Sequence, residues 1–427
     1  MPFRATSGRP GYFATTNMGD VADPALARDN TSGALYFAAD TQRPSVYYPN
    51  GTNQPGRIYA PVWRSINNGD SVQAPVNASA SLTNQSWSDI TDGPVVVVDN
   101  FPGTGQGDVY LSFAWLHPQS DIILCRSTNG GLDWQIIQQI TNVCRGNVFM
   151  TTNHEVCVGW QPVQDCAHGL QPYTNTFYID RSTNRGVSFY TTNVTHLVSN
   201  GGTNKFTRSI TAPADDQFFG GVGSLAVNPA NGYLYYAYYD KPATGTNRPN
   251  IYLRQLTNGV DWTDPIQVNV EPGGIATDQW QPTVAVKPDG TRLFIAWYDR
   301  RDDSTNHFLI RVYGAFATLP ITSTNAFTTN FPVSTVSFPP VFAGSTMTGT
   351  NQFDPVYPPG VRNDGTNCPT CGNGIYSPYT MGDFNRAFSG TNCVYHTWGD
   401  NRNTYTATNG FTRNQADVRF IRVSWPH

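Results

Sequence analysis

A short turn sequence that occurs four times constrains this chain more than any other feature. Its clearest copy runs from Ser127 to Trp134, with Asn two, Gly four and Trp seven residues after the serine. Asn hydrogen-bonds its own backbone in tight turns, and Gly131 can adopt a positive φ without steric cost. Apolar stretches lie on both sides, at 121–125 and 134–137. The pattern predicts a β-hairpin.

Three further segments repeat the turn in the same register. Ser182 to Phe189 keeps Ser, Asn and Gly, with Phe in the place of Trp, and Ser65 to Val72 keeps the same first three residues. Gln255 to Trp262 keeps only the Gly and the Trp. Repetition in register is the sequence signature of a repeat architecture, in which each turn marks one structural unit.

Composition favours strands and turns over helices. Charged residues make up 13% of the chain against a usual ~25%, and aromatic residues also make up 13%. Glutamate, which is common on helix surfaces, occurs only as Glu155 and Glu271. Ahead of each turn a pair of apolar stretches recurs, for example 281–287 followed by 293–299. Four antiparallel strands at a period of about 40–50 residues or more are typical of a propeller blade.

We therefore predict an all-β, six-bladed β-propeller of four-stranded antiparallel blades, which occupies residues 1–427 as a single domain. Residues 326–373 are rich in Thr, Pro, Asn and Gly, and we interpret them as an irregular insertion before the last blade. The predicted blades fall at approximately 20–80, 88–143, 144–200, 208–272, 276–325 and 374–427.

The repeated turns resemble the Asp-box, or BNR, repeats of the sialidase superfamily. The likeness covers residues 20–425 and extends to segments that are similar to those of uncharacterised secreted members: Asp278–Pro282, Trp297–Arg301, Met381–Phe384 and Trp398–Arg402. It implies a sialidase-like propeller. It implies less about function, because Asp-box propellers include sialidases, other glycosidases and proteins without catalytic activity.

The order of strands predicts one end of the blades at which charged side chains gather. The first strand of a blade starts beside the end of the second, whereas the repeated turns join the third and fourth strands at the other end. The end opposite the turns carries Asp278 and 299–303 in the fifth blade, and Asp383 and 400–402 in the sixth. This concentration of carboxylates and arginines is the main functional clue in a chain so poor in charge.

The resemblance implies roles for these residues in a sialidase-type exo-glycosidase that acts on a terminal, anionic sugar. Such enzymes bind the sugar carboxylate through an arginine cluster and use a Tyr nucleophile, a Glu that polarises it, and an Asp as acid and base. The catalytic candidates are Asp89 or Asp92 as the acid, Tyr298 or Tyr376 as the nucleophile, and Glu271. The substrate-binding candidates are Arg300, Arg301, Arg402, Arg386, Arg208, Asp278 and Asp383.

A structural role is the competing interpretation of the same residues. An Asp that begins one strand and an Arg that ends its neighbour can form an ion pair that only fixes the rim of a blade. Arginines that converge on one pocket would support the enzyme, whereas arginines paired with aspartates of their own blades would argue against it. Calcium held by several Asp carboxylates is a third interpretation, although the expected activity requires no cofactor.

Charge and hydropathy narrow the class of partner. The net charge of −4 and the lack of a basic run argue against a nucleic-acid surface. No apolar stretch approaches the ~18 residues that span a membrane. The start, Met1–Thr6, has no hydrophobic signal region, so the sequence is a mature or trimmed form, a protein exported by another route, or one that stays inside the cell.

Seven cysteines mildly favour an oxidising compartment. Cys157 and Cys166 bracket a short segment that a disulfide would close, and the pair Cys368 and Cys371 favours a disulfide, with or without Cys393, over a zinc site. We expect an extracellular or cell-surface protein that recognises glycans or glycoconjugates and hydrolyses them if it is an enzyme. The alternatives are a non-catalytic adhesion module and a self-associating subunit of an extracellular assembly.

Overall fold

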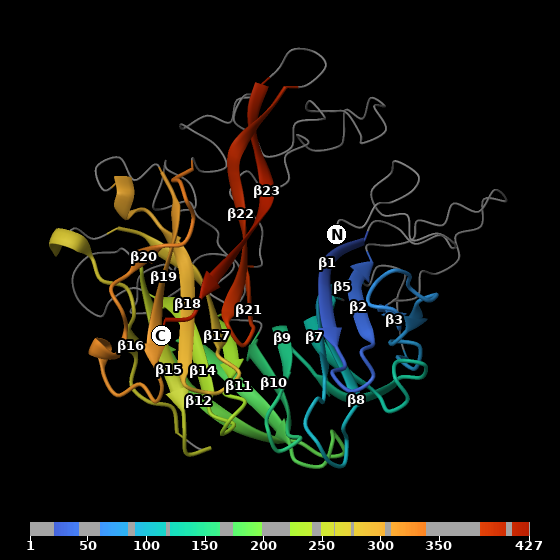
Figure 1. Ribbon diagram of the computed structural model, residues 1–427. Coiled ribbons are helices and arrows are strands. Elements are labelled where there is room, and N and C mark those ends of the chain that lie inside the picture. Colours follow the sequence, from blue (N-terminus) through green and yellow to red (C-terminus); the bar gives the residue numbers. More distant parts are fainter. Residues whose placement is uncertain are drawn as a thin grey trace. The chain divides into compact units, whose positions relative to one another are not determined.

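The computed structural model describes two compact units, each with three β-sheets (Figure 1). The first unit comprises residues 1–166 and 176–197, and the second comprises 167–175 and 198–427. The residues that the structure describes are 21–41, 60–83, 90–116, 120–162, 174–198, 223–240, 249–259, 261–274, 277–303, 309–338, 385–406 and 412–426.

In every sheet the strands lie side by side in the order of the chain. The first unit holds β1 (Val21–Arg28), β2 (Leu35–Thr41), β3 (Pro61–Ser65) and β4 (Val76–Asn77); β5 (Ile90–Val98), β6 (Val109–Leu116), β7 (Ser120–Ser127) and β8 (Gln135–Ile140); and β9 (Val143–Met150), β10 (Val156–Pro162), β11 (Thr174–Ser182) and β12 (Tyr190–Val198).

The second unit continues the same pattern. It holds β13 (Ser224–Val227), β14 (Leu234–Asp240), β15 (Asn250–Leu256) and β16 (Ile266–Gln267); β17 (Gln279–Val286), β18 (Arg292–Asp299), β19 (Arg311–Thr318) and β20 (Phe331–Pro332); and β21 (Arg386–Ser389), β22 (Cys393–Thr406) and β23 (Thr412–Ser424). Among its described residues the helical elements are three single 3₁₀ turns: η1 (Pro272–Gly274), η2 (Arg301–Asp303) and η3 (Thr324–Ala326).

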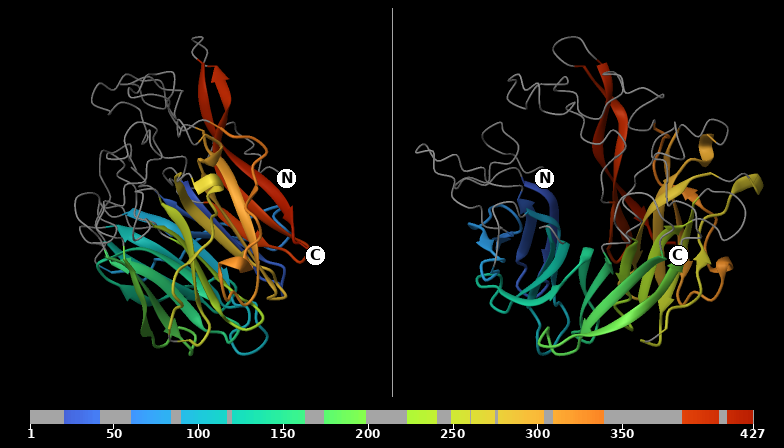
Figure 2. Two further views of the ribbon diagram at one scale, coloured as in Figure 1. Left: turned by 90° about the vertical axis from the view of Figure 1, so that its left-hand side faces the viewer. Right: turned by 180° about the vertical axis from the view of Figure 1, so that it is seen from behind.

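These sheets are the six blades of a β-propeller, as the sequence predicts. Five have four strands, and the sixth has three within the described residues. In that last blade β22 and β23 run on past the short β21 as a long two-stranded ribbon, drawn in red in Figure 2. Strand β20 lies within 326–373, so part of the predicted insertion belongs to the fifth blade.

The repeated turn joins the third strand of its blade to the fourth, which confirms the predicted connection. Between β7 and β8, the Ser127 hydroxyl accepts the Gly131 N–H at 2.8 Å and donates to the Asn129 side chain at 3.0 Å. Asn129 in turn accepts the Asp133 N–H at 2.9 Å. Gly131 has a φ of +83°, the left-handed region that the sequence position requires. The Trp134 ring folds back and donates to the Gly131 carbonyl at 3.1 Å.

The turns that start at Ser65 and Ser182 contain the same hydrogen bonds. The serine hydroxyl accepts the N–H of Gly69 in one turn and of Gly186 in the other, at 2.9 and 2.8 Å. The copy that starts at Gln255 lacks the serine and is closed differently, because Asn258 accepts the Asp261 N–H three residues later. One local sequence therefore produces one local geometry wherever its Ser, Asn and Gly are all present.

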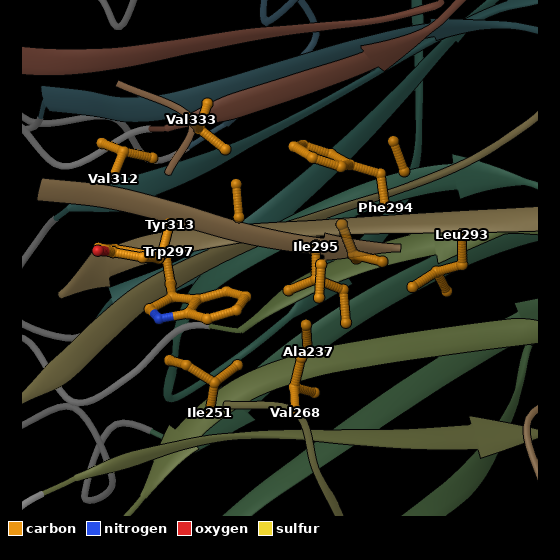
Figure 3. Packing of buried hydrophobic residues seen from close by; sticks show 14 of the residues in the cluster. Ala237, Ile251, Val268, Leu293, Phe294, Ile295, Trp297, Val312, Tyr313 and Val333 are labelled. Atoms are coloured by element: carbon orange, nitrogen blue, oxygen red, sulfur yellow. The ribbon is translucent and has the colours of Figure 1, made fainter. Parts of the chain in front are cut away.

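Strands β17 and β18 of the fifth blade are buried on both faces. In the fifth blade, each residue of β17 and all but the first of β18 are buried. Figure 3 shows Ile295 and Trp297 of β18 packed near Ile251 and Val268 of the preceding blade. Blades that pack on either side of a sheet leave it no solvated face, which explains why β18 is a continuous apolar run instead of an alternating one.

The cysteine predictions find no support in the described residues. Cys125, Cys157 and Cys393 are buried and carry free thiols, so neither Cys157 nor Cys393 forms the disulfide that we expected. Burial raises the pKa of the Cys157 thiol well above its ordinary value, which makes it a small apolar core residue. Cys166, Cys368 and Cys371 lie outside the described residues. Within the described chain, no helix has the length and apolarity to cross a membrane.

Candidate functional site

The ends of β17 and β18 bring together the charged residues of the fifth blade. Gln279 pairs with Asp299 in the antiparallel register, and the Arg300 N–H donates to the Asp278 carbonyl at 3.2 Å. The Arg300 guanidinium lies 3.3 Å from the Asp278 carboxylate and 5.3 Å from the Trp280 ring centroid. Both charged side chains are almost fully buried, so this ion pair belongs to the interior of the blade.

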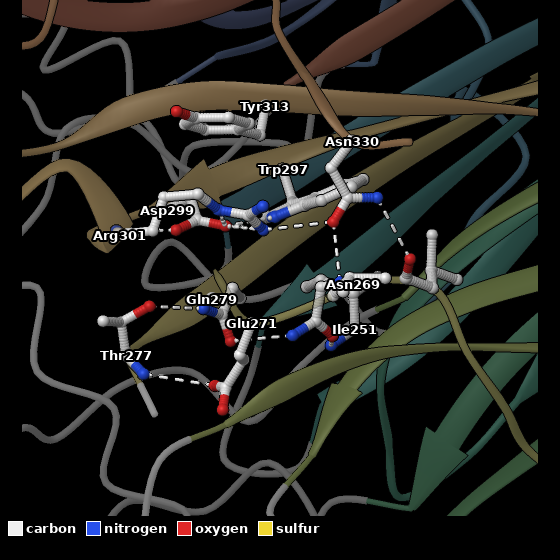
Figure 4. Close-up of polar contacts among 12 residues, drawn as sticks. Ile251, Asn269, Glu271, Thr277, Gln279, Trp297, Asp299, Arg301, Tyr313 and Asn330 are labelled. Carbon is white, nitrogen blue, oxygen red and sulfur yellow. Dashed lines mark hydrogen bonds and ion pairs between the residues drawn. The ribbon is translucent and has the colours of Figure 1, made fainter. Parts of the chain in front are cut away.

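A second ion pair lies next to the first. Arg301 donates to the Asp299 carboxylate from Nε at 2.9 Å and from Nη2 at 2.6 Å, and its backbone N–H donates at 2.8 Å. The Trp297 indole donates to the same carboxylate at 2.9 Å. The Arg301 guanidinium also lies 4.3 Å from the Tyr313 ring centroid, as Figure 4 shows.

The sixth blade repeats this arrangement at the end of its own strand. Asp400 accepts hydrogen bonds from the Trp398 indole at 3.3 Å, and from the backbone and guanidinium of Arg402. The shared spacing Trp-x-Asp-x-Arg therefore forms a local clamp in both blades. Arg300, Arg301 and Arg402 each pair with an aspartate of their own blade, which is the outcome that argues against a converging arginine cluster.

A hydrogen-bonded network continues from Arg301 towards the preceding blade (Figure 4). The Asn330 side chain accepts from Arg301 at 3.2 Å and from the Val270 N–H at 2.7 Å, and donates to the Val268 carbonyl at 3.2 Å. The Asn269 amide donates to Gln279 at 3.2 Å. These polar groups are satisfied by one another, which makes this end of the fourth and fifth blades a rigid platform.

Glu271 lies at the solvent side of this platform, directly after the fourth blade. Its carboxylate is half-buried and accepts the Thr277 N–H at 3.1 Å. Burial raises the pKa of Glu271, and the nearby negative charges of Asp299 and Asp278 add to the effect, while the Thr277 N–H and Arg301 oppose it. A carboxyl group with a raised pKa, partly open to solvent, is the most chemically distinctive group in the described part of this end.

The pKa of Asp302 is shifted in the opposite direction to that of Glu271. Burial disfavours its ionised form, but hydrogen bonds from Tyr313, Arg311 and Ser337 outweigh burial and lower the pKa of Asp302. Tyr313 is the ring under Arg301, so Asp302 and Glu271 are both connected to the Arg301 cluster. The pKa values of the two carboxyl groups are therefore shifted in opposite directions.

Tyr298, a candidate nucleophile, is fully buried. Its hydroxyl accepts the Gly399 N–H at 3.0 Å and lies 2.8 Å from the Gly399 carbonyl, and it also contacts Asn385 at 3.2 Å. These contacts join the fifth blade to the sixth, so the hydroxyl serves packing between blades in this structure.

The other candidates are spread over the chain. Arg386 is exposed on β21 in the second unit, and Asp92 is partly exposed on β5 in the first, at an irregularity in the register with β6. Asp89, Tyr376, Arg208 and Asp383 lie outside the described residues, and their roles stay predictions. In the described part of the chain, no group of three or more His, Cys, Asp or Glu could hold a metal ion, and the calcium hypothesis is untested beyond it.

The sequence interpretation missed a tyrosine–carboxylate pair in the third blade. The Tyr190 hydroxyl donates to Glu155 at 2.9 Å, and Arg181 binds the same carboxylate through two nitrogens, at 2.9 and 2.6 Å. Burial and the Glu155 contact raise the pKa of Tyr190, so the phenol is held neutral and is a poor nucleophile. The rarity of glutamate was the only sequence signal for this cluster, which lies at the end of the blade that carries the repeated turn.

Solved structures similar to the chain are propellers of several kinds. A protein of unknown function from Dyadobacter fermentans has 12% identity, covers 96% of each chain and gives a TM-score of 0.48. The α-L-arabinofuranosidase of Fusarium graminearum has 11% identity, covers 94% of each and gives 0.45. A Hadza microbial sialidase has 14% identity and gives 0.43, over 69% of this chain and 52% of the sialidase.

No protein-family model matches the chain, and no curated protein matches it in sequence. The chain spans about half the length of the sialidase. At these identities the similarity concerns the fold alone. The choice of ligand and reaction therefore depends on the side chains described above.

Proposed function

We propose that the chain recognises glycans at the platform formed by the fourth and fifth blades, with Glu271 in contact with the sugar. The observation that carries the proposal is the half-buried carboxyl of Glu271, whose pKa is raised, at the edge of a hydrogen-bonded polar network. Carboxyl, amide and guanidinium groups bind the hydroxyls of a sugar through oriented hydrogen bonds. Glu271 and Asn330 are both partly exposed here, beside the nearly buried Arg301 guanidinium.

The charge of the platform favours a neutral sugar. Arg300 and Arg301 are already matched by Asp278 and Asp299, so neither is available as a separate clamp for a carboxylate. Glu271 adds a further acidic group beside these pairs. An anionic sugar would meet unfavourable charge at this platform, whereas hydroxyl groups would not.

Hydrolysis of the bound glycan is the second candidate function. Glycosidases use two carboxyl groups, one protonated to donate to the leaving group and one ionised. The raised pKa of Glu271 and the lowered pKa of Asp302 provide such a difference at one end of the blade. Under this proposal Glu271 is the acid and Asp302 the ionised partner.

A glycan array probed with the purified chain tests the proposal, followed by calorimetry with the glycans that bind. We expect neutral glycans to be retained and Glu271→Gln to lose the interaction. Asp289→Asn is the matched control, because Asp289 is an exposed aspartate at the opposite end of the same blade. Binding confined to sialosides, no binding at all, or full binding by the Glu271 variant would each overturn it.

A panel of fluorogenic glycosides separates hydrolysis from binding. Turnover of a neutral glycoside that Glu271→Gln and Asp302→Asn both abolish would support the enzyme. Retention of glycans with no turnover over the whole panel would leave the chain as a binding module. Turnover of a sialoside alone would contradict the charge argument.

A further inference from the structure

The loop between β5 and β6 connects three blades of the first unit. This loop, 99–108, contacts the first blade through Asn100, which accepts the Asn30 N–H at 2.7 Å and donates to the Arg28 carbonyl at 2.9 Å. The Gln106 amide donates to Thr31 at 2.8 Å. On its other side the loop contacts the third blade, so it acts as a strap across neighbouring blades.

His154 makes one of the two attachments to the third blade. It lies in the turn between β9 and β10, and its Nδ1 is 2.8 Å from the Asp99 carboxylate. Its Nε2 is 3.1 Å from the Pro102 carbonyl. Both partners are hydrogen-bond acceptors, and a neutral imidazole has only one N–H to donate. The two contacts are therefore satisfied together only by the doubly protonated, positively charged ring.

The backbone at Gly103 and at His154 itself accommodates the two contacts of the ring. A side chain at Gly103 would come within 2.8 Å of the His154 Nε2, so only glycine leaves room for the ring there. His154 itself has a φ of +58°, a left-handed conformation that non-glycine residues adopt at a cost when surrounding contacts hold them.

The remaining charged groups near the ring are bound by partners of opposite charge or by hydrogen bonds. Asp108, at the end of the loop, binds Arg185 through two hydrogen bonds of 2.9 Å and Arg126 through a third of 3.0 Å. Arg185 also faces Asp99, because a side chain at Gly105 would meet both. Glu155, the neighbour of His154 in the chain, is bound by Arg181 and Tyr190. Only histidine among these side chains ordinarily changes charge between about pH 5 and 8.

We infer that the 99–108 loop is a pH-sensitive strap, locked to the third blade when His154 carries both ring protons and loosened when the ring releases one of them to solvent. Loss of the proton leaves a nitrogen lone pair facing either Asp99 or the Pro102 carbonyl. The Arg185–Asp108 attachment does not involve His154, so the loop loosens at its Asp99–Pro102 end first. The strap belongs to the first unit and does not depend on the function proposed for Glu271.

Hydrogen–deuterium exchange of the full chain tests the inference at about pH 5 and about pH 8, with rates corrected for the intrinsic effect of pH. Loss of a charge-assisted hydrogen bond raises the equilibrium constant for local opening about tenfold. We therefore expect the peptide that covers 100–107 to open about tenfold more at the higher pH. His154→Gln, which cannot be protonated, should exchange rapidly at both values and remove the difference.

Asn100→Ala is the matched control, because it weakens the attachment to the first blade without removing a titratable group. It should raise exchange at both pH values and preserve the tenfold ratio. Nitrogen-15 NMR of the histidine rings tests the same inference in the wild-type chain. We expect both ring nitrogens of His154 to be protonated at the lower pH. A neutral His154 ring at about pH 5, or a ratio unchanged in His154→Gln, would overturn the inference.

Discussion

The repeated turns and the platform of the second unit are built by different kinds of contact. At the repeated turns, the hydrogen bonds of Ser127 and Asn129 join residues at most four positions apart. At the platform of the second unit, Asn330 connects residues of the fifth blade to Val268 and Val270 in the preceding one. A turn can therefore be encoded by a short sequence pattern, whereas the candidate site exists only where two blades meet.

The Asp–Arg ion pairs share features with both the local turns and the platform between blades. Asp299 and Arg301 are two residues apart and form a clamp that Asp400 and Arg402 repeat. Their short spacing makes each pair a local structure, although both pairs lie at the end of the blade that we associated with substrate. Position at the functional end therefore does not make a charged residue available to a ligand.

Asp299→Ala is expected to cause the largest effect, because it would leave the nearly buried guanidinium of Arg301 without its carboxylate. The cost of leaving one partner of a buried ion pair is about 3–5 kcal/mol in the free energy of unfolding. Urea denaturation measures this loss in the free energy of unfolding. Asp289→Ala, which removes an exposed partner of Lys287, should cost less than about 0.5 kcal/mol. Equal losses in the two variants would show that the Asp299 clamp behaves as a surface pair.

The pH dependence of the second unit should reflect His396. Burial lowers the pKa of His396 to about 4, so the folded chain binds the proton less readily than the unfolded chain does. Its contribution to stability is therefore complete above about pH 6.5 and falls as the pH drops towards 4, by about 3 kcal/mol. Denaturation midpoints across this range measure the loss.

His396→Phe is the variant that isolates this effect, since His396 packs among Phe294 and Trp398. The variant should lose the part of the acid sensitivity that comes from His396. If its stability declines with acid as steeply as that of the wild type, other groups account for the dependence.

Ser127→Ala tests how much a repeated turn contributes to stability. It removes the acceptor of the buried Gly131 N–H, so the free energy of unfolding should fall by about 1–2 kcal/mol. Ser182→Ala should cost the same amount, because Gly186 loses the same hydrogen bond. Thr128→Ala, an exposed position in the same turn, is the control and should be within about 0.5 kcal/mol of wild type. A Ser127→Ala variant as stable as the Thr128→Ala control would contradict the prediction.

Glu271→Gln should have the smallest effect on stability. A raised folded-state pKa means that the carboxyl's contribution is complete below its unfolded-state pKa and is lost as the pH rises through the folded value. The variant should therefore be slightly more stable than wild type at neutral pH, by a few tenths of a kcal/mol, and equal to it in acid. Thermal midpoints at about pH 3.5 and 7 check the sign, and a loss of stability at neutral pH would contradict it.

The sequence alone determined the fold class, the repeated turns and the adjacency of Asp278 and Asp299 to the end of β18. These features follow from residue types at fixed short spacings: Ser, Asn and Gly close a turn, and alternating strands and turns define a blade. The same spacings drew attention to the arginines but could not show that each was already bound to an aspartate.

Only the tertiary structure decided which side chains are available. Burial made Tyr298 a contact between blades, and free thiols replaced the disulfides expected at Cys157 and Cys393. Burial also raised the pKa of Glu271, and the charges of Asp299 and Asp278 add to that effect. The physical reason is that burial and electrostatic environment depend on atoms brought together from distant parts of the chain. A pattern of neighbours in sequence holds no information about them.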